Sequence, residues 1–177
     1  MKIFRRRPPT PAETRALVEQ QYPPGTRFRF DDAGLPHCDD ADPLTPAIET
    51  PDGTRMWYCH GRLDSPPNGG PAVVEPDGYK AWYLDGKLHR TDGPAAIHPD
   101  GTELYYQHGH LHREDGPAVV APGIDAAAWW LHGRHVTRRT HAHLVEQMRG
   151  PIQGPPAPDP ARHLDEDFGI SMVMDPL

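Results

Sequence analysis

One short segment occurs four times in succession between Thr45 and Val136. Each copy combines a Pro-Ala pair, a turn glycine, an aromatic pair and a second glycine. The turn glycines are separated by 25, 23 and 22 residues: Gly53, Gly78, Gly101 and Gly123. Recurrence at such a period is the signature of a repeat architecture, in which no unit buries its apolar face alone. The repeat therefore limits the chain to folds that stack one small unit on the next.

Each copy has the pattern of short antiparallel strands separated by tight turns. In the copy that starts at Gly70, the apolar run from Ala72 to Val74 meets a Pro-Asp-Gly turn. An aromatic-rich run from Tyr79 to Leu84 follows. It ends at Asp85-Gly86, where both residue types tolerate the positive φ of a hairpin turn. The sequence predicts a mostly β fold, an antiparallel meander or solenoid of tandem hairpin repeats of about 23 residues.

The segments on either side of the repeats are expected to form two short helices that cap the array. Thr10-Pro11-Ala12-Glu13 has the form of a capping box with proline at the first helical position. Leu17 and Val18 would give this helix a small apolar face. An apolar stripe predicts the C-terminal helix: Leu144, Val145 and Met148. The chain then divides into a basic arm (1–9), the N-terminal helix (10–22), the β-repeat domain (24–136, with a weak first copy at 24–44 and clear copies at 45–136), the C-terminal helix (137–149), and a proline-rich linker with an acidic tail (150–177).

The aromatic pairs are the candidate interface. Side chains alternate across a strand, so each pair places one ring on either face of the sheet. A single-layer sheet with only two short helices leaves part of one face exposed, and exposed apolar patches mark interfaces. We therefore expect interface residues in both aromatic rows and in the tail: Trp57, Trp82, Tyr105 and Trp129; Tyr58, Tyr83, Tyr106 and Trp130; and Phe168, Ile170 and Met172.

Charge and composition limit the classes of partner. The net charge is -7 and the strongly basic stretch is the N-terminal arm. Nucleic acid is therefore not an expected partner, apart from contacts by Arg5, Arg6 and Arg7. No apolar run approaches the ~18 residues of a membrane span, and no signal peptide opens the sequence. Two cysteines make no disulfide framework. These features favour a cytoplasmic protein, or one made in the cytoplasm and incorporated into a virion.

Twelve histidines are the feature that suggests chemistry. His108, His110 and His112 form the densest group, and His110 and His112 would share one face of a strand, a spacing that suits zinc or copper. Duplication of the repeat unit would also place histidines at these positions without any metal site. We therefore expect no resident cofactor. No nucleophile elbow, P-loop, dinucleotide fingerprint or Cys-x-x-Cys occurs, so no catalytic residue is assigned and an enzyme is not expected.

The unit resembles the MORN family of repeats, in a divergent variant. The resemblance rests on Pro76-Asp77-Gly78, on the run from Trp82 to Arg90, and on their counterparts Pro99 to Gly101 and Tyr105 to Arg113. Gly-Pro-Ala stands where that family tends to have Gly-x-Gly, and the two glycines of a copy are closer together. The resemblance implies an elongated antiparallel sheet of hairpins that serves protein contacts, assembly or lipid contact, and it implies no chemistry.

The sequence as a whole favours a non-enzymatic protein–protein interaction or assembly module that presents a repeat sheet, with its tails as docking segments. The partner would be another protein or further copies of this one, and a structural protein of a phage or virion is one setting. Two alternatives stay open. The acidic tail suits an immunity protein or antitoxin that neutralises a basic toxin, and the histidine group suits a metal-binding protein or hydrolase. A peripheral membrane role is disfavoured because the chain has no basic amphipathic helix.

Overall fold

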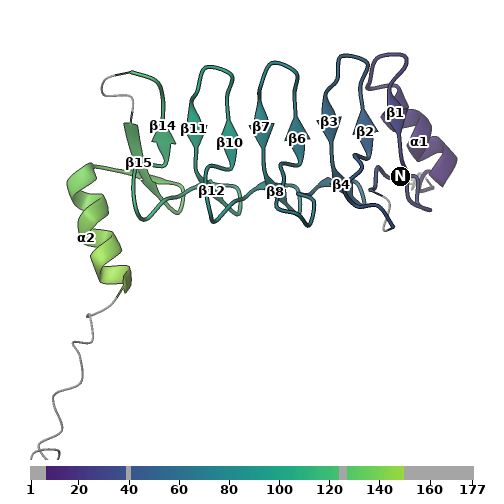
Figure 1. Cartoon of the computed structure of the whole chain (residues 1–177). Coiled ribbons are helices and arrows are strands. Elements are labelled where there is room, and N and C mark those ends of the chain that lie inside the picture. The colour runs from purple at the N-terminus through teal and green to yellow at the C-terminus, as the bar shows by residue number, and fades with distance from the viewer. Residues whose placement is uncertain (1–6, 39–40, 124–126, 150–177) are drawn as a thin grey trace, which may run out of the picture.

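The computed structural model describes residues 7–38, 41–123 and 127–149 and shows an elongated array of hairpins with a helix at each end (Figure 1). The predicted fold class is confirmed: the main sheet is an antiparallel meander of ten strands. In spatial order these are β1 (Arg27–Phe28), β2 (Ile48–Glu49), β3 (Arg55–Met56), β6 (Val73–Val74), β7 (Lys80–Ala81), β10 (Ala96–Ile97), β11 (Glu103–Leu104), β14 (Val119–Val120), β15 (Ala127–Leu131) and β16 (Arg134–Val136).

Three smaller hairpins lie beside the main sheet, one in each of the first three clear copies. They pair β4 (Tyr58–Cys59) with β5 (Arg62–Leu63), β8 (Tyr83–Leu84) with β9 (Lys87–Leu88), and β12 (Tyr106–Gln107) with β13 (His110–Leu111). Figure 1 shows them along the lower edge of the array, below the larger hairpins. Each of these three copies therefore consists of one hairpin of the main sheet followed by one small hairpin, whereas the strands of the fourth copy all belong to the main sheet.

The two turns of a copy have the conformations that their residues favour. Gly78 (φ +101°) closes the first turn, where Asp77 accepts a hydrogen bond from the Tyr79 amide at 2.9 Å. The second turn places Asp85 at φ +51° and Gly86 at +78°. Two successive positive φ angles define the type I′ turn, whose twist matches that of the strands it joins. The Asp85-Gly86 prediction is thus confirmed.

The aromatic-rich run is not one strand in the first three clear copies, which corrects the expectation from sequence. In the copy that starts at Gly70 it divides at Trp82 into β7 and β8. The Trp82 amide donates to the Ala95 carbonyl of the next copy at 2.8 Å, whereas its carbonyl accepts from the His89 amide of its own copy at 3.0 Å. The hydrogen-bonding partner changes at this residue, so the chain leaves the main sheet here and enters the small hairpin.

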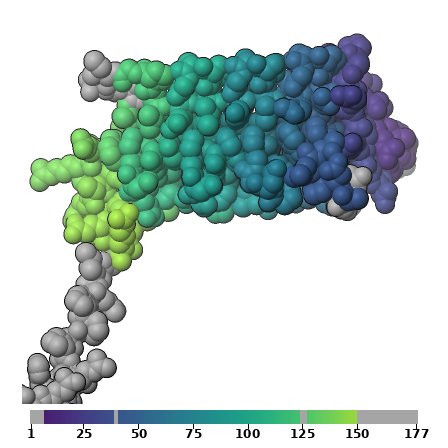
Figure 2. All heavy atoms as spheres, viewed as in Figure 1, coloured from purple at the N-terminus to yellow at the C-terminus, as the bar shows by residue number. Residues whose placement is uncertain are grey.

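One part of the core is a row of apolar side chains that crosses the main sheet, and a second part includes the buried Ala72, Trp82 and Ala95 outside this row. Ala81 and Ala96 are buried in the row, and Leu63, Tyr83 and Leu88 of the small hairpins pack against them. Strand register aligns the row from one copy to the next: Phe28, Ile48, Met56, Val73, Ala81, Ala96, Leu104, Val119 and Ala128. Figure 2 shows the copies in contact along the whole array. No copy completes this row alone, as expected for a repeat fold.

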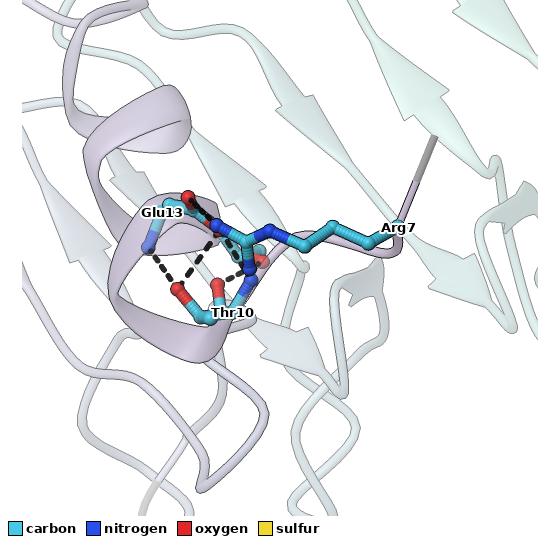
Figure 3. A network of polar contacts seen from close by, with 4 residues as sticks. Arg7, Thr10 and Glu13 are labelled. Carbon is cyan, nitrogen blue, oxygen red and sulfur yellow. Dashed lines mark hydrogen bonds and ion pairs between the residues drawn. The ribbon is translucent and has the colours of Figure 1, made fainter. Parts of the chain in front are cut away.

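The N-terminal helix α1 (Pro11–Glu19) begins at the predicted capping box. The Thr10 amide donates to Glu13 Oε2 at 2.7 Å, the Glu13 amide donates to Thr10 Oγ1 at 3.3 Å, and Arg7 pairs with Glu13 (Figure 3). The helix ends at Glu19, before the predicted residue 22. Its expected apolar face is also wrong, because no residue of α1 is buried and Leu17 is 56% exposed. Pro11 and Arg15 hold the helix to the array instead, against Gly34 and Phe30.

The C-terminal helix α2 (Arg138–Arg149) lies at the other end of the array. Val145 is buried as predicted, but Met148 is exposed. The second buried residue is His141, whose Nε2 lies 2.6 Å from the Arg113 carbonyl and whose ring meets Trp129 edge-on. In the part of the chain that the structure describes, no helix has both the length and the apolar character to cross a bilayer.

Candidate functional site

One aromatic residue from each small hairpin lies on the face that carries the apolar row. Strand pairing sets each of these tyrosines opposite a leucine: Tyr58 opposite Leu63, Tyr83 opposite Leu88, and Tyr106 opposite Leu111. All six side chains are partly buried and partly exposed. We call these three pairs the tyrosine–leucine row. In this row, apolar side chains reach the surface at the same place in three successive copies.

Burial keeps the Tyr58 and Tyr83 hydroxyl groups of this row protonated to a higher pH than an ordinary tyrosine. It raises the pKa of the Tyr83 hydroxyl above the ordinary value of 10. Burial, and then a hydrogen bond with Tyr22, raises the pKa of Tyr58 further. Both phenols are therefore neutral at physiological pH, so the row presents apolar rings and uncharged hydroxyl groups.

The opposite aromatic row is covered by loops of its own copies and of the preceding ones. Trp57 and Trp82 are only 8% and 9% exposed, and their indole N–H groups donate to the Leu44 and Gly69 carbonyls at 3.0 and 2.9 Å. Tyr105 and Trp129 are less buried, but arginine side chains stack over their rings. We therefore remove Trp57 and Trp82 from the candidate interface, because a partner cannot reach them without opening these loops.

Arginine–aspartate pairs fix the loops over that covered row. The Arg90 guanidinium lies 4.0 Å from the centroid of the Trp82 ring, and its Nε donates to Asp92 at 2.8 Å. Arg113 repeats both contacts with Tyr105 and Asp115 in the next copy. A stacked cation with its carboxylate partner holds the ring in place. These pairs therefore hold the loops and rings of the covered row in position.

Most of the histidines that recur in the repeats form ring-to-ring pairs across copy boundaries, called stacked pairs below although the His89–His108 rings are tilted by 41°. The His89 and His108 rings lie 4.4 Å apart, and the His108 amide donates to His89 Nδ1 at 3.1 Å. His112 and His132 repeat this geometry at 4.3 and 3.1 Å, and His37 and His60 at 4.3 and 3.2 Å. In each pair, the histidine three residues after the second glycine of one copy binds the turn residue of the next.

No family model, curated protein or solved structure matches this chain.

The histidine group expected from sequence is not brought together. His108 and His112 belong to two different stacked pairs, and His110 is an exposed residue of β13. Among the described residues, the histidines, cysteines and carboxylates that converge closely enough to hold a metal are His37, Cys59 and His60. Sequence reasoning missed this group because its members come from two different copies. The signal that could have found it is the position of His37, three residues after Gly34, which matches that of His89 after Gly86.

The interface candidates in the acidic tail, Phe168, Ile170 and Met172, lie outside the described residues, as do Arg5 and Arg6 of the basic arm. Beside α2, an open recess is lined by Trp129, His141, Val145 and charged residues that include Glu114 and Arg149. Its walls belong to α2 and to the last two copies, so it does not recur along the array as the tyrosine–leucine row does.

The stacked pairs predict that the protein loses stability in mild acid. Burial, followed by the neighbouring His108, lowers the pKa of His89 below 6.5. Burial, followed by His132, also lowers the pKa of His112, and Glu114 opposes this shift with a smaller effect. The unfolded chain therefore binds more protons than the folded chain once the pH falls below about 6.5. We expect the free energy of unfolding, measured in urea, to be steady above that pH and to fall as the pH is lowered through 6 towards the depressed pKa values.

The double variant His89→Asn/His112→Asn is the control for this pH dependence. The side-chain oxygen of asparagine can accept the same amide hydrogen bond, and asparagine does not titrate. Asp64, which occupies the equivalent position three residues after Gly61, accepts a hydrogen bond from the Asp85 amide in this way. The variant should therefore show a shallower loss of stability between pH 7 and 5. An unchanged slope would mean that other groups cause the acid sensitivity.

Proposed function

We propose that this protein is a non-enzymatic binding scaffold that docks another protein along the tyrosine–leucine row. The observation that carries the proposal is the recurrence of a partly exposed Tyr–Leu pair at the same place in three successive copies. Tyrosine combines apolar area with a polar hydroxyl and loses little conformational freedom on binding, which makes it frequent in the cores of interfaces. The resemblance of the unit to MORN repeats supports the same kind of role.

The spacing of the row defines the partner that it fits. Each copy adds two strands to the main sheet, and neighbouring strands lie about 4.8 Å apart. Equivalent tyrosines are therefore about 10 Å apart along the array. A complementary surface would carry apolar side chains at a similar spacing, along one helix or one extended segment. An array built this way binds a long surface through several modest contacts rather than through one deep pocket.

The other face of the main sheet is suited to solvent. Its cross-strand row begins Arg27, Glu49 and Arg55, and continues through Lys80 and Glu103 with intervening apolar residues. Arg27 and Glu49 form an ion pair at 2.6 Å. Opposite charges on neighbouring strands stabilise a solvent-facing sheet and disfavour apolar docking. This asymmetry between the faces favours the tyrosine–leucine row as the docking face.

Photo-crosslinking tests the proposal. In cells that make this protein, Tyr83 is replaced by p-benzoylphenylalanine, an aromatic residue larger than tyrosine that bonds to C–H groups within a few ångströms when illuminated. The control carries the same residue at Lys80, an exposed position three residues earlier on the opposite face. We expect a discrete adduct, with a partner or with a second copy of the chain, from Tyr83 and not from Lys80. Absence of any adduct, or equal adducts from both sites, would contradict the docking face.

A further inference from the structure

The first stacked histidine pair differs from the later ones in what surrounds it. His37 and His60 stack at 4.3 Å, as the others do. The residue before the turn, however, is Cys59, where the later histidine-paired copies have Gln107 and Leu131. One nitrogen of each imidazole and the Cys59 sulfur all lie within 4.8 Å of one another. Duplication of the unit explains the pair of rings but not the thiol beside them.

Asp31 is a second feature of the first pair: its carboxylate lies closer to the imidazole than the 3.7 Å between Glu114 and His112 in a later pair. Its Oδ2 lies 2.7 Å from His60 Nδ1, and its Oδ1 accepts hydrogen bonds from the Ala33 and Leu35 amides at 3.0 and 2.9 Å. The carboxylate is therefore fixed and holds the His60 ring proton on Nδ1. The lone pair of His60 then lies on Nε2. A carboxylate bonded to the far nitrogen is the usual support of a metal-binding histidine.

We propose that His37, Cys59 and His60 bind one divalent transition-metal ion of the zinc type. Two imidazole nitrogens and a thiolate are donors that select zinc over calcium or magnesium, and a tetrahedral ion has one further position for water. His37 comes from the first, weak copy, and Cys59 and His60 come from the second. The ion links these two copies at the N-terminal end of the array and so stabilises the end where the repeat sequence is least regular.

Metal binding changes one hydrogen bond that can be observed. His37 Nδ1 accepts the His60 amide at 3.2 Å, which places the proton of the neutral His37 ring on Nε2. Coordination through Nε2 moves that proton to Nδ1, so the His60 amide loses its acceptor. The His60 amide resonance should therefore shift on metal binding. The His108 amide, which bonds to His89 in the same way, should not shift.

Cobalt titration of the reduced, metal-free, full-length protein tests the site. We expect one Co²⁺ per chain, with the ligand-field bands of a tetrahedral ion and a thiolate-to-cobalt charge-transfer band. Cys59→Ser should abolish the charge-transfer band, and because Cys59 is exposed this substitution leaves the fold intact. Asp31→Asn should weaken binding about 10- to 100-fold, the usual effect of losing such a support. A charge-transfer band that survives Cys59→Ser, or the absence of saturable binding, would overturn the proposal.

A matched pair of turn variants separates the metal site from the stacking itself. His60 and His108 occupy the same turn position, at φ +45° and +50°, and asparagine tolerates this conformation. His60→Asn should reduce cobalt affinity at least tenfold, whereas His108→Asn should leave it unchanged. Zinc at a hundred times its dissociation constant should raise the melting temperature of the unaltered protein by about 5–10 °C. Equal cobalt affinity in the two variants would refute the assignment of His60.

Discussion

Trp82→Ala is expected to destabilise the protein by about 3–5 kcal/mol, the range for removing a buried tryptophan. The Trp82 side chain is 9% exposed, its indole N–H bonds to the Gly69 carbonyl, and the Arg90 guanidinium stacks on its ring. The substitution leaves a cavity and removes both contacts from the middle of the array. A domain of this size is stable by only about 5–15 kcal/mol, so the loss is a large part of the total. Urea unfolding followed by circular dichroism measures it.

Leu84→Ala is the matched control for Trp82. Leu84 lies two residues further along the same run but is 42% exposed, so its truncation removes little buried area. We expect a loss below about 1 kcal/mol. If the two variants lost similar stability, the covered aromatic row would not be the structural core that the contacts indicate.

Gly34→Ala is expected to cost about 2–5 kcal/mol and to detach α1 from the array. Gly34 has φ +79°, and a Cβ atom at this position would lie 2.2 Å from the carbonyl oxygen of Pro11, the first residue of α1. The contact is with backbone, so no side-chain rotation relieves it. The loss combines left-handed strain with displacement of the helix. Proteolysis within α1 and the free energy of unfolding both report it.

Gly53→Ala separates the strain from the clash. Gly53 has φ +94°, but nothing lies within 4 Å of a Cβ atom there. This variant should lose only the strain, about 1–2 kcal/mol, with α1 as protease-resistant as before. Equal losses at the two glycines, with α1 intact in both, would show that Pro11 does not rest on Gly34.

The features that the sequence predicted correctly are those that depend on contacts within one copy or one short segment. Asp85-Gly86 closes a type I′ turn because few other residue pairs adopt two positive φ angles. Alternation within a run correctly placed Ala81 and Tyr83 on one face, where they share a cluster. The capping box likewise depends on contacts between Thr10 and Glu13, three residues apart.

The features that could not be predicted depend on contacts between copies. The strand breaks at Trp82 because its amide bonds to the next copy whereas its carbonyl bonds to its own copy. No local sequence pattern predicts this change of partner. The same holds for the convergence of His37 with Cys59 and His60. Burial of Trp82 depends on a loop that ends at the Gly69 carbonyl, thirteen residues earlier. In each case the local sequence sets the residue types, and stacking of the copies decides which of them meet.

The most direct measurement is the crosslinking yield along the whole array. p-Benzoylphenylalanine is placed in turn at Tyr58, Tyr83 and Tyr106, and at the three residues that precede them by three positions on the opposite face, Arg55, Lys80 and Glu103. A scaffold that docks a protein along the tyrosine–leucine row should give the same adduct at all three tyrosine positions and none at the three controls. Adducts that form only at the controls, or at neither set, would contradict it.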